Sequence, residues 1–436
     1  MSKSVPIIAI VGRANVGKSS LFNALIGRRE AIVAIEPGTT RDRVTAKAGY
    51  GGKEFWLVDT AGIKPAEDEF ELSIQEQIVE ATEAASLILV VVEADVPVTA
   101  EDRRVAKMAL KSHKSAILVV NKIDKNRQAD LLSWQALGIK PMFATSTTQK
   151  SGIDELLVFL AASLPLAKIK VAKDLIRLSI LGRPNVGKSS LFNSLAAKQQ
   201  ALVAPQAGTT RDVNRLVVRF KSHEIELADT AGIRRPGRIE RGVEHFSVLR
   251  SIAAIEESDI CLLVMDSAEP NTQLDQKIAG MVKEAGRGLI LVLNKWDIVE
   301  GSLDKDKFGA QVAQAFPFVP WAPLIYTNAI SGQNVTKIFD LALEISENRS
   351  LKIKTSELNR WLRQTVDSKE PPPMRRHLPK LNYMVQEEDI DMPSFKIFGS
   401  HTRFLHWSYK RYLERRFRET WPLVGTPLKF WFIEKH

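Results

Sequence analysis

The sequence predicts an α/β protein: two consecutive domains, each a mostly parallel sheet with helices on both faces, followed by a small α+β domain. Three observations carry this prediction. A set of motifs occurs twice, 170 residues apart. Short apolar runs alternate with helical patterns through each copy, as in wound α/β domains. The last fifth of the chain carries most of the excess positive charge.

The repeat spans a whole domain. Residues 12–23, GRANVGKSSLFN, return at 182–193 as GRPNVGKSSLFN. The same offset relates GTTRD at 38–42 to 208–212 and DTAGI at 59–63 to 229–233. Further along, NKID at 121–124 corresponds to NKWD at 294–297, an offset of 173. A period this long indicates a duplicated domain and not a solenoid.

Buried strands are predicted at matching places in the two copies. They are residues 7–11, 55–58, 87–92 and 116–120 in the first copy, and 176–181, 225–228, 260–265 and 288–293 in the second. The predicted domain bounds are 1–163, a linker at 164–174, 175–348, and 349–436.

Composition points to a cytoplasmic protein without membrane segments. No apolar run reaches the roughly 18 residues of a membrane span, and residues 1–6 are a short polar lead, unlike a secretory signal. The single cysteine, Cys261, cannot form an intramolecular disulfide, which fits a reducing compartment. Its apolar surroundings favour a buried strand position over a reactive thiol.

The net charge of +10 is unevenly distributed. After residue 350 there are 17 Lys and Arg against 10 Asp and Glu. A basic terminal module suggests a polyanionic partner, and nucleic acid is favoured over a membrane.

Both copies contain a phosphate loop, G-x-x-x-x-G-K-S, after a predicted strand and before a predicted helix. Backbone N–H groups of such a loop and the positive end of the helix face a nucleotide's phosphates. Lys18 and Lys188 are expected to reach the β- and γ-phosphates. A chance glycine-rich turn is the alternative, which two copies with the same downstream motifs disfavour. The predicted nucleotide-binding residues here are Gly12, Arg13, Ala14, Asn15, Val16, Gly17, Lys18, Ser19 and Ser20, with Gly182, Arg183, Pro184, Asn185, Val186, Gly187, Lys188, Ser189 and Ser190.

A second group of residues is expected to hold Mg²⁺ and the γ-phosphate. Each Asp-Thr-Ala-Gly-Ile follows an apolar strand, which places its carboxylate beside the phosphate loop. A threonine of each Gly-Thr-Thr-Arg-Asp is expected to close on Mg²⁺ only while the γ-phosphate is present. The predicted Mg²⁺ ligands are Ser19, Thr40, Asp59, Ser189, Thr210 and Asp229, and the predicted catalytic residues are Lys18, Thr40, Lys188 and Thr210. Nucleotide contacts are also expected from Asp59, Thr60, Ala61, Gly62 and Ile63, and from Asp229, Thr230, Ala231, Gly232 and Ile233.

The N-K-x-D segments predict a guanine site, so the nucleotide is GTP or GDP. One carboxylate can accept both N1–H and the N2 amino group of guanine, whereas adenine would leave it unpaired. A surface turn is the alternative. The predicted base contacts are Asn121, Lys122 and Asp124, and Asn294, Lys295 and Asp297. The last base loop is placed at Ser146 and Thr147, and at Asn328 and Ala329, although neither keeps the Ser-Ala pair usual in G proteins.

Unassisted hydrolysis is expected to be slow. Ile63 and Ile233 stand where Ras-type GTPases have a glutamine that orients water. Asn15 and Asn185 could instead help to bind K⁺ against the phosphates, where a cation offsets developing charge. The alternative is that these asparagines only brace the loop.

With these motifs, the chain resembles the Der (also called EngA) tandem GTPases of bacteria, which have two G domains of the P-loop NTPase class and a C-terminal KH-like domain. The C-terminal region agrees at residues 371–373, 380–383, 393–395, 408–413 and 425–427. The resemblance implies hydrolysis of GTP to GDP and phosphate. It also implies a role in assembly of the large ribosomal subunit, with the GTP state controlling binding to ribosomal RNA. We expect a monomer. Ala14 departs from the proline found at Pro184.

The C-terminal domain lacks the G-x-x-G loop of ordinary KH modules. Two sets of side chains are candidates for RNA contact. The first shares one helical face and favours core packing over base stacking: Leu405, Tyr409, Tyr412, Leu413 and Phe417. The second is basic and favours RNA or ribosome contact over a solvated face: Lys410, Arg411, Arg415 and Arg418. Arg234, Arg235, Arg238 and Arg241, in the second switch of the second copy, are either a solvated loop or an RNA-facing or interdomain patch.

Two further interpretations stay open. One G domain could bind GTP without turnover and regulate the other, making the protein a GTP-sensing scaffold. The protein could also be a partner GTPase of an RNA-modification enzyme, although no segment resembles a catalytic domain for that chemistry.

Overall fold

A computed structural model describes residues 5–26, 45–51, 53–60, 85–125, 131–164, 175–197, 214–229, 248–301, 304–374, 377–388 and 390–434. The chain forms two compact units, 1–173 with 241–257, and 174–240 with 258–436. The fold class predicted from the sequence is confirmed, because each copy of the repeat forms a six-stranded, mostly parallel sheet and a three-stranded sheet follows.

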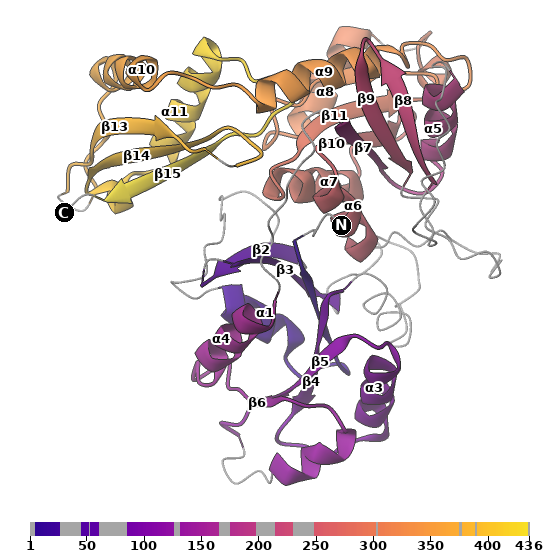
Figure 1. The fold of residues 1–436 in the computed structure, drawn as a ribbon, viewed down its shortest axis with the longest axis vertical. Coiled ribbons are helices and arrows are strands. Elements are labelled where there is room, and N and C mark those ends of the chain that lie inside the picture. Colours follow the sequence, from indigo (N-terminus) through magenta and orange to yellow (C-terminus); the bar gives the residue numbers. More distant parts are fainter. Residues whose placement is uncertain are drawn as a thin grey trace. The chain divides into compact units, whose positions relative to one another are not determined.

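The sheet of the first copy has the strand order β2-β3-β1-β4-β5-β6 (Figure 1). Its strands are β1 (Ile7–Val11), β2 (Thr45–Tyr50), β3 (Lys53–Asp59), β4 (Leu87–Glu93), β5 (Ser115–Asn121) and β6 (Met142–Ala144). Only the β2–β3 pair is antiparallel. The central strands β1 and β4 are buried at every position, which is why they read as unbroken apolar runs.

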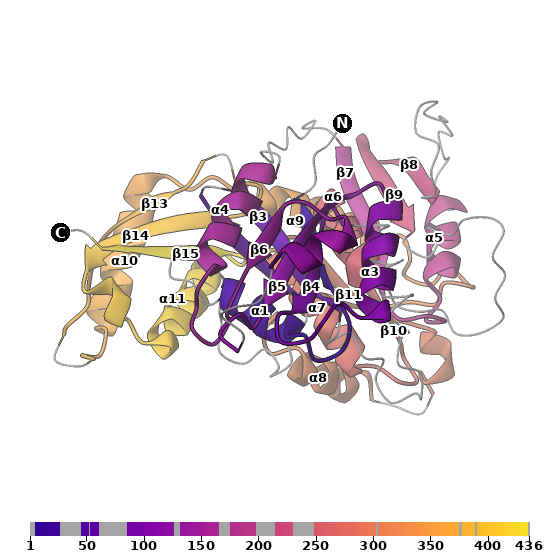
Figure 2. The ribbon, with the colours of Figure 1, turned by 90° about the horizontal axis from the view of Figure 1, so that it is seen from below.

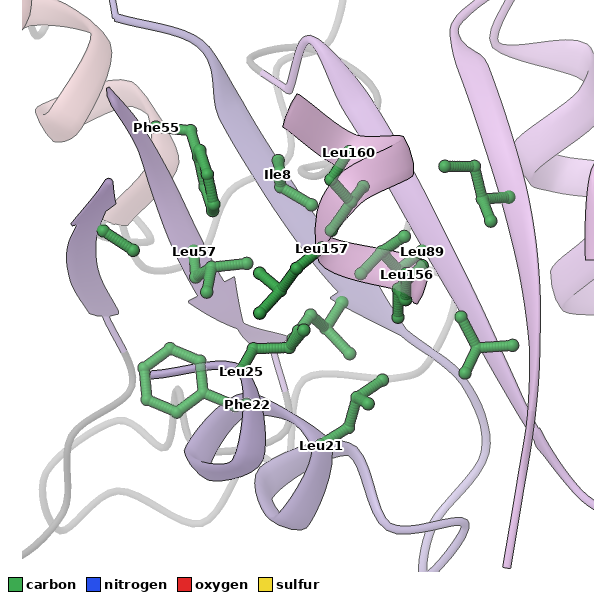
Figure 3. Packing of buried hydrophobic residues seen from close by; sticks show 14 of the residues in the cluster. Ile8, Leu21, Phe22, Leu25, Phe55, Leu57, Leu89, Leu156, Leu157 and Leu160 are labelled. Atoms are coloured by element: carbon green, nitrogen blue, oxygen red, sulfur yellow. The ribbon is translucent and has the colours of Figure 1, made fainter. Parts of the chain in front are cut away.

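Helices cover both faces of this sheet (Figure 2). Helices α1 (Lys18–Ile26) and α4 (Ile153–Ser163) pack on one face, while α3 (Ala100–Lys111) and the 3₁₀ helix η2 (Leu131–Leu137) lie on the other. Figure 3 shows leucines of α1 and α4 meeting strand residues such as Ile8, Leu57 and Leu89 in one core. Helix α6 (Val248–Glu257) also belongs to this unit, where Trp56 Nε1 donates to Glu256 Oε1 at 2.5 Å.

The second copy repeats the arrangement with the order β12-β11-β10-β7-β9-β8. Its strands are β7 (Leu175–Leu181), β8 (Asn214–Phe220), β9 (His223–Asp229), β10 (Ile260–Asp266), β11 (Gly288–Asn294) and β12 (Leu324–Tyr326). Its helices are α5 (Lys188–Ala197), α7 (Gln273–Glu284), η4 (Trp296–Ile298), α8 (Lys305–Ala315) and α9 (Lys337–Arg349). Cys261 is buried in β10, as the sequence predicted.

The C-terminal region forms a small domain of three strands, two α-helices and one 3₁₀ helix. These are α10 (Thr355–Ser368), β13 (Lys380–Gln386), β14 (Ser394–Ser400), η5 (Thr402–Phe404), α11 (Trp407–Thr420) and β15 (Lys429–Glu434). β14 pairs antiparallel with β13 and parallel with β15. Leu405, Tyr409, Leu413 and Phe417 are buried in its core, so the core-packing interpretation of that helical face is confirmed.

Within the second unit, the segment around Gly425, which follows α11, packs against the start of β11 and the end of α9. Gly425 accepts from the backbone N–H of Leu289 at 3.0 Å and donates to Trp321 O at 2.8 Å. Its φ is +66°, and a Cβ built there would lie 2.2 Å from Ile345 Cδ1, so only glycine fits this close approach. No helix in the described part of the chain is both long and apolar enough to cross a membrane.

Candidate nucleotide-binding sites

Those predicted site segments that the structure describes meet, in each copy, at the carboxyl edge of its parallel strands. In the first copy the phosphate loop follows β1, Asp59 ends β3, Glu93 ends β4 and Asn121 ends β5. Ligands of open α/β sheets bind at this edge. The site is therefore assembled by sheet topology from segments up to about a hundred residues apart.

The first phosphate loop is tightly curled before α1. Gly17 has a φ of +94°, and a Cβ there would lie 2.4 Å from Asn121 Nδ2. Asn15 has a φ of +63°, a left-handed conformation that asparagine tolerates better than most residues. The loop backbone therefore turns back on itself at the start of α1, where helix N–H groups are unpaired within the helix.

Lys18 is buried inside this loop. Its Nζ donates to Gly12 O at 2.8 Å and to Arg13 O at 2.7 Å, and only 5% of the residue is exposed. Burial lowers the pKa of Lys18, although the charge of Asp59 opposes this effect. The ammonium is thus held within the curl of the loop, where a polyphosphate would meet it.

A hydroxyl and a carboxylate lie together beside the loop. Ser19 Oγ donates to Asp59 Oδ2 at 2.5 Å, and Asp59 is 1% exposed. Thr60, the next residue, donates its hydroxyl to Ile10 O at 2.8 Å and so ties the end of β3 to β1. Adjacent hard oxygen donors of this kind are the ligands that Mg²⁺ prefers, so the pair fits the ion.

The second copy reproduces these contacts. Lys188 Nζ donates to Arg183 O at 2.5 Å, and Ser189 Oγ donates to Asp229 Oδ2 at 3.1 Å. Gly187 has a φ of +93°. Ser20 and Ser190 are exposed on the first turns of their helices. The two phosphate loops are accordingly equivalent in backbone shape, even though the first has Ala14 at the position where the second has Pro184.

The asparagine of each N-K-x-D ties the base loop to the phosphate loop. Asn121 Nδ2 donates to Val16 O at 3.1 Å, and Asn294 Nδ2 donates to Val186 O at 2.9 Å. Both asparagines are buried. This contact connects the part of the site that would hold a base to the part that would hold phosphates.

The following lysines lie along the same edge. Lys122 Nζ donates to Asn15 O and to Glu93 Oε1, both at 2.7 Å. Lys295 Nζ donates to Asn185 O at 2.9 Å and to Asp266 Oδ2 at 2.6 Å. Their stems therefore run over the phosphate loop toward its asparagine.

The two copies differ at the last base loop. Ser146 is fully buried, and its Oγ donates to Asp124 Oδ1 at 2.5 Å. Its counterpart Asn328 instead accepts from the N–H groups of Ile330 and Ser331 at 2.9 and 3.1 Å. The neighbouring residues also differ: Thr147 is partly buried, whereas the N–H of Ala329 donates to Asn294 Oδ1 at 3.0 Å. In the described part of the second copy no hydrogen bond reaches the Asp297 carboxylate.

Sequence reasoning missed the acids that hold the site lysines and arginines. Burial opposes ionisation of Glu93, but the hydrogen bond and charge of Lys122 and the charge of Arg13 outweigh it and lower its pKa. Asp266 has the same role beside Lys295, and its pKa is also lowered. The available signal was an acidic residue ending the third predicted strand of each copy.

A second missed contact orients the arginine of each phosphate loop. Arg13 lies 3.2 Å from Glu93 and 3.4 Å from Asp102, the acid of the capping box that begins α3. Arg183 pairs in the same way with Glu269 and with Asp275 of α7. Burial raises the pKa of Asp275 despite its hydrogen bond from Thr272. The arginines are therefore engaged with protein carboxylates.

Several predicted residues lie outside the described residues, and their placement remains a prediction. They are the switch threonines and most of each D-T-A-G-I, together with the arginines that follow the second one: Thr40, Ala61, Gly62, Ile63, Thr210, Thr230, Ala231, Gly232, Ile233, Arg234, Arg235, Arg238 and Arg241.

The predicted basic face of α11 is partly used within its own domain. Lys410, Arg411 and Arg415 are exposed. Arg418 instead donates to Glu414 at 3.1 Å and to Thr426 O at 3.1 Å, and its burial lowers its pKa. Arg418 therefore holds the segment after α11 in place, which leaves three cations of this set on the surface.

Comparison with known proteins agrees with this architecture. A family profile described as "50S ribosome-binding GTPase" matches residues 7–122 and 177–295, and one described as "KH-domain-like of EngA bacterial GTPase enzymes, C-terminal" matches 352–432. GTPase Der of Gemmatimonas aurantiaca is 41% identical over 98% of both chains. GTPase Der of Thermomicrobium roseum is 41% identical over 99% of this chain and 96% of its own. Among solved structures, Aquifex aeolicus Era bound to GDP and aluminium fluoride is 20% identical with a TM-score of 0.31, covering 60% of this chain and 94% of that one.

Identity of this extent over the full length, with two GTPase domains and the C-terminal KH-like domain in the same order, shows the family directly. The protein is a GTP hydrolase that binds GTP and GDP. The chain belongs to the GTPase Der family.

Proposed function

We propose that the protein is a nucleotide-controlled factor in assembly of the large ribosomal subunit, and that its GTP state governs its binding to ribosomal RNA. Two features support this role: the family profile described as a 50S ribosome-binding GTPase, and the basic C-terminal domain. In this function hydrolysis resets a conformational switch. The protein works as a monomer in the cytoplasm.

The observation that carries the GTPase mechanism is the repeated contact between the N-K-x-D asparagine and the phosphate loop. It couples guanine recognition by Asp124 and Asp297 to the placement of the phosphates. Loop N–H groups with Lys18 and Lys188 bind the β- and γ-phosphates and offset the charge that develops during attack by water.

Mg²⁺ would be held by Ser19 and Asp59 in the first domain and by Ser189 and Asp229 in the second. When bound, the ion supplies charge neutralisation on the phosphates. Thr40 and Thr210 complete each site from the first switch. The hydroxyl–carboxylate pairs described above support this assignment.

K⁺ bound through Asn15 and Asn185 is part of the same proposal, because no glutamine follows the D-T-A-G motifs. The left-handed φ of both asparagines also fits a bracing role. GTPase rates in K⁺ and Na⁺ buffers separate the two possibilities: faster turnover in K⁺ supports the cation site, and equal rates remove it.

The proposed role is tested by sedimenting the protein with ribosomal subunits in GDP or in a non-hydrolysable GTP analogue. Nucleotide-dependent migration with the large subunit is expected. Migration with neither subunit in either nucleotide would refute the role. Single changes Lys18→Ala and Lys188→Ala then test the scaffold alternative. If both domains hydrolyse GTP, each variant should lose the GTPase activity of the domain that it changes. If one domain is purely regulatory, changing its lysine should remove no hydrolysis by that domain.

The domain bounds at 1–163, 164–174, 175–348 and 349–436 also remain part of this proposal. Limited proteolysis should cut first within the linker and release the first domain.

A further inference from the structure

We propose that helix α3 of the first G domain carries a binding surface for the phosphate backbone of RNA, formed by Arg103, Lys107 and Lys111. This inference deepens the proposed function and rests on it, because it names a contact by which the first G domain itself would engage RNA.

The three cations form a continuous row. They are spaced i, i+4 and i+8 on α3, so they share one face and extend over about 12 Å at 1.5 Å per residue. All three are exposed. No ion pair to any of them is found among the residues that the structure describes. Their charge is therefore available to a ligand.

The row borders a hollow of about 490 Å³ between α3 and η2. Among the residues that the structure describes, no acidic side chain is part of its wall. Its lining residues are Arg103, Lys107, Leu110, Lys111, His113, Ala136 and Leu137. The hollow is concave. Its described charged side chains are all basic, and the rest of its described lining is apolar apart from His113.

The second copy of the repeat serves as an internal comparison. Helix α7 begins with the same capping box as α3, Thr272 with Asp275 in place of Thr99 with Asp102, so their registers correspond. In that register Arg103, Lys107 and Lys111 are replaced by Gln276, Gly280 and Glu284. The same helix thus folds without the cations. The row is not a requirement of the fold.

The turn that follows α3 also differs from the turn that follows α7, in its side chain and in its exposure. Gly286 takes the place of His113, and both have a left-handed φ, +70° and +56°. In the second copy this turn is covered by the C-terminal domain, whose Met392 Sδ lies 2.7 Å from the position of a Cβ on Gly286. Arg349, the last residue of α9, also donates from Nη1 to Gly286 O at 2.9 Å. In the first copy His113 is exposed.

The chemistry of this face fits RNA phosphates. Of the described side chains that line the hollow, Leu110 is the one large apolar side chain that is exposed, at 47%, which gives too little apolar surface to insert into a membrane. In the described lining of the hollow, no aromatic ring other than the imidazole of His113 is present to stack on a base. Such a surface contacts backbone phosphates without reading sequence, and it weakens as salt rises.

The test replaces the row in the full-length protein by Arg103→Gln, Lys107→Gln and Lys111→Gln together. The matched control removes three exposed cations of the second G domain by Arg219→Gln, Lys307→Gln and Lys337→Gln. Binding to two labelled RNA hairpins of unrelated sequence is measured by fluorescence anisotropy over a range of salt, with GTPase rate as the check on folding.

For the α3 variant we expect about tenfold weaker binding to both hairpins near physiological salt, and a salt slope smaller by about 2, since each phosphate contact contributes roughly 0.7–0.9 to that slope. The control variant should keep the wild-type slope, and GTPase rates should be unchanged in both. Equal affinity of wild type and α3 variant would overturn this inference and leave the proposed function standing.

Two other results are distinguishable. A wild-type protein that binds neither hairpin nor ribosomal subunits would refute the proposed function, and this surface with it. Binding of wild type, but not of the α3 variant, to anionic phosphatidylserine vesicles, with RNA binding unchanged, would assign the row to a membrane and overturn the RNA assignment.

Discussion

The different last base loops of the two G domains make their guanine sites unequal. In the first domain the buried Ser146 holds Asp124, the carboxylate expected to accept from guanine, through a partly buried hydrogen bond of 2.5 Å. In the second domain Asn328 uses its side chain to cap its own loop. The perturbations that test this difference are Ser146→Ala in the first domain and Asn328→Ser in the second.

The expected loss of GDP affinity follows from the type of hydrogen bond that is removed. A hydrogen bond to a charged group contributes about 1.5–3 kcal/mol. Asp124 is half-buried, so water partly replaces the lost hydroxyl, and we take the lower end. About 1.5 kcal/mol corresponds to roughly tenfold weaker GDP binding by the first domain of Ser146→Ala. Asn328→Ser should tighten the second domain by a smaller factor, because it also removes the cap of its loop.

The assay titrates fluorescent GDP into proteins with one domain silenced, by Lys188→Ala for the first-domain measurement and Lys18→Ala for the second. Inosine diphosphate, which lacks the N2 amino group, measures the discrimination. Thr148→Ala, an exposed change in the same loop, is the matched control and should bind like wild type. Unchanged GDP affinity in Ser146→Ala, or a loss equal to that of Thr148→Ala, would refute the reasoning.

Three further outcomes are expected. The pKa of Glu93 is lowered in the folded protein. The contribution of its carboxylate to stability is therefore present above the unfolded pKa of 4.5 and is lost as pH falls through the lower folded pKa. The Tm difference between wild type and Glu93→Gln should shrink below about pH 4, and a Tm difference that is constant with pH would contradict this. Gly425→Val should destabilise the second unit by about 2–4 kcal/mol, because the backbone φ is left-handed and the added side chain would overpack against Ile345. The control Gly301→Ala has nothing within 4 Å of the added Cβ and should leave the denaturant midpoint of the second unit unchanged. Gly280→Ala should raise stability by about 0.5–1 kcal/mol, because the glycine lies inside α7 with open space around it; a lower denaturant midpoint would show that this part of α7 is strained.

The sequence by itself determined the two-copy architecture, because buried parallel strands must be apolar on both faces and phosphate loops need a fixed glycine and lysine spacing. All eight strands expected in the two copies are present. It did not predict β2, β6, β8 or β12. Strands β2 and β8 are antiparallel edge strands with mixed polarity, and β6 and β12 are only three residues long. None of the four therefore gives a periodic signal in the sequence.

Only the tertiary structure decided which charged groups meet. Glu93 and Lys122 are 29 residues apart, and Arg13 and Asp102 are 89 apart, yet parallel strand packing brings each pair within 3.4 Å. The structure also decided that Arg418 is structural while the α3 cations are exposed, since burial depends on which faces pack together. Local sequence fixes residue chemistry and spacing, but contacts between distant segments depend on the free energy of the whole packed chain.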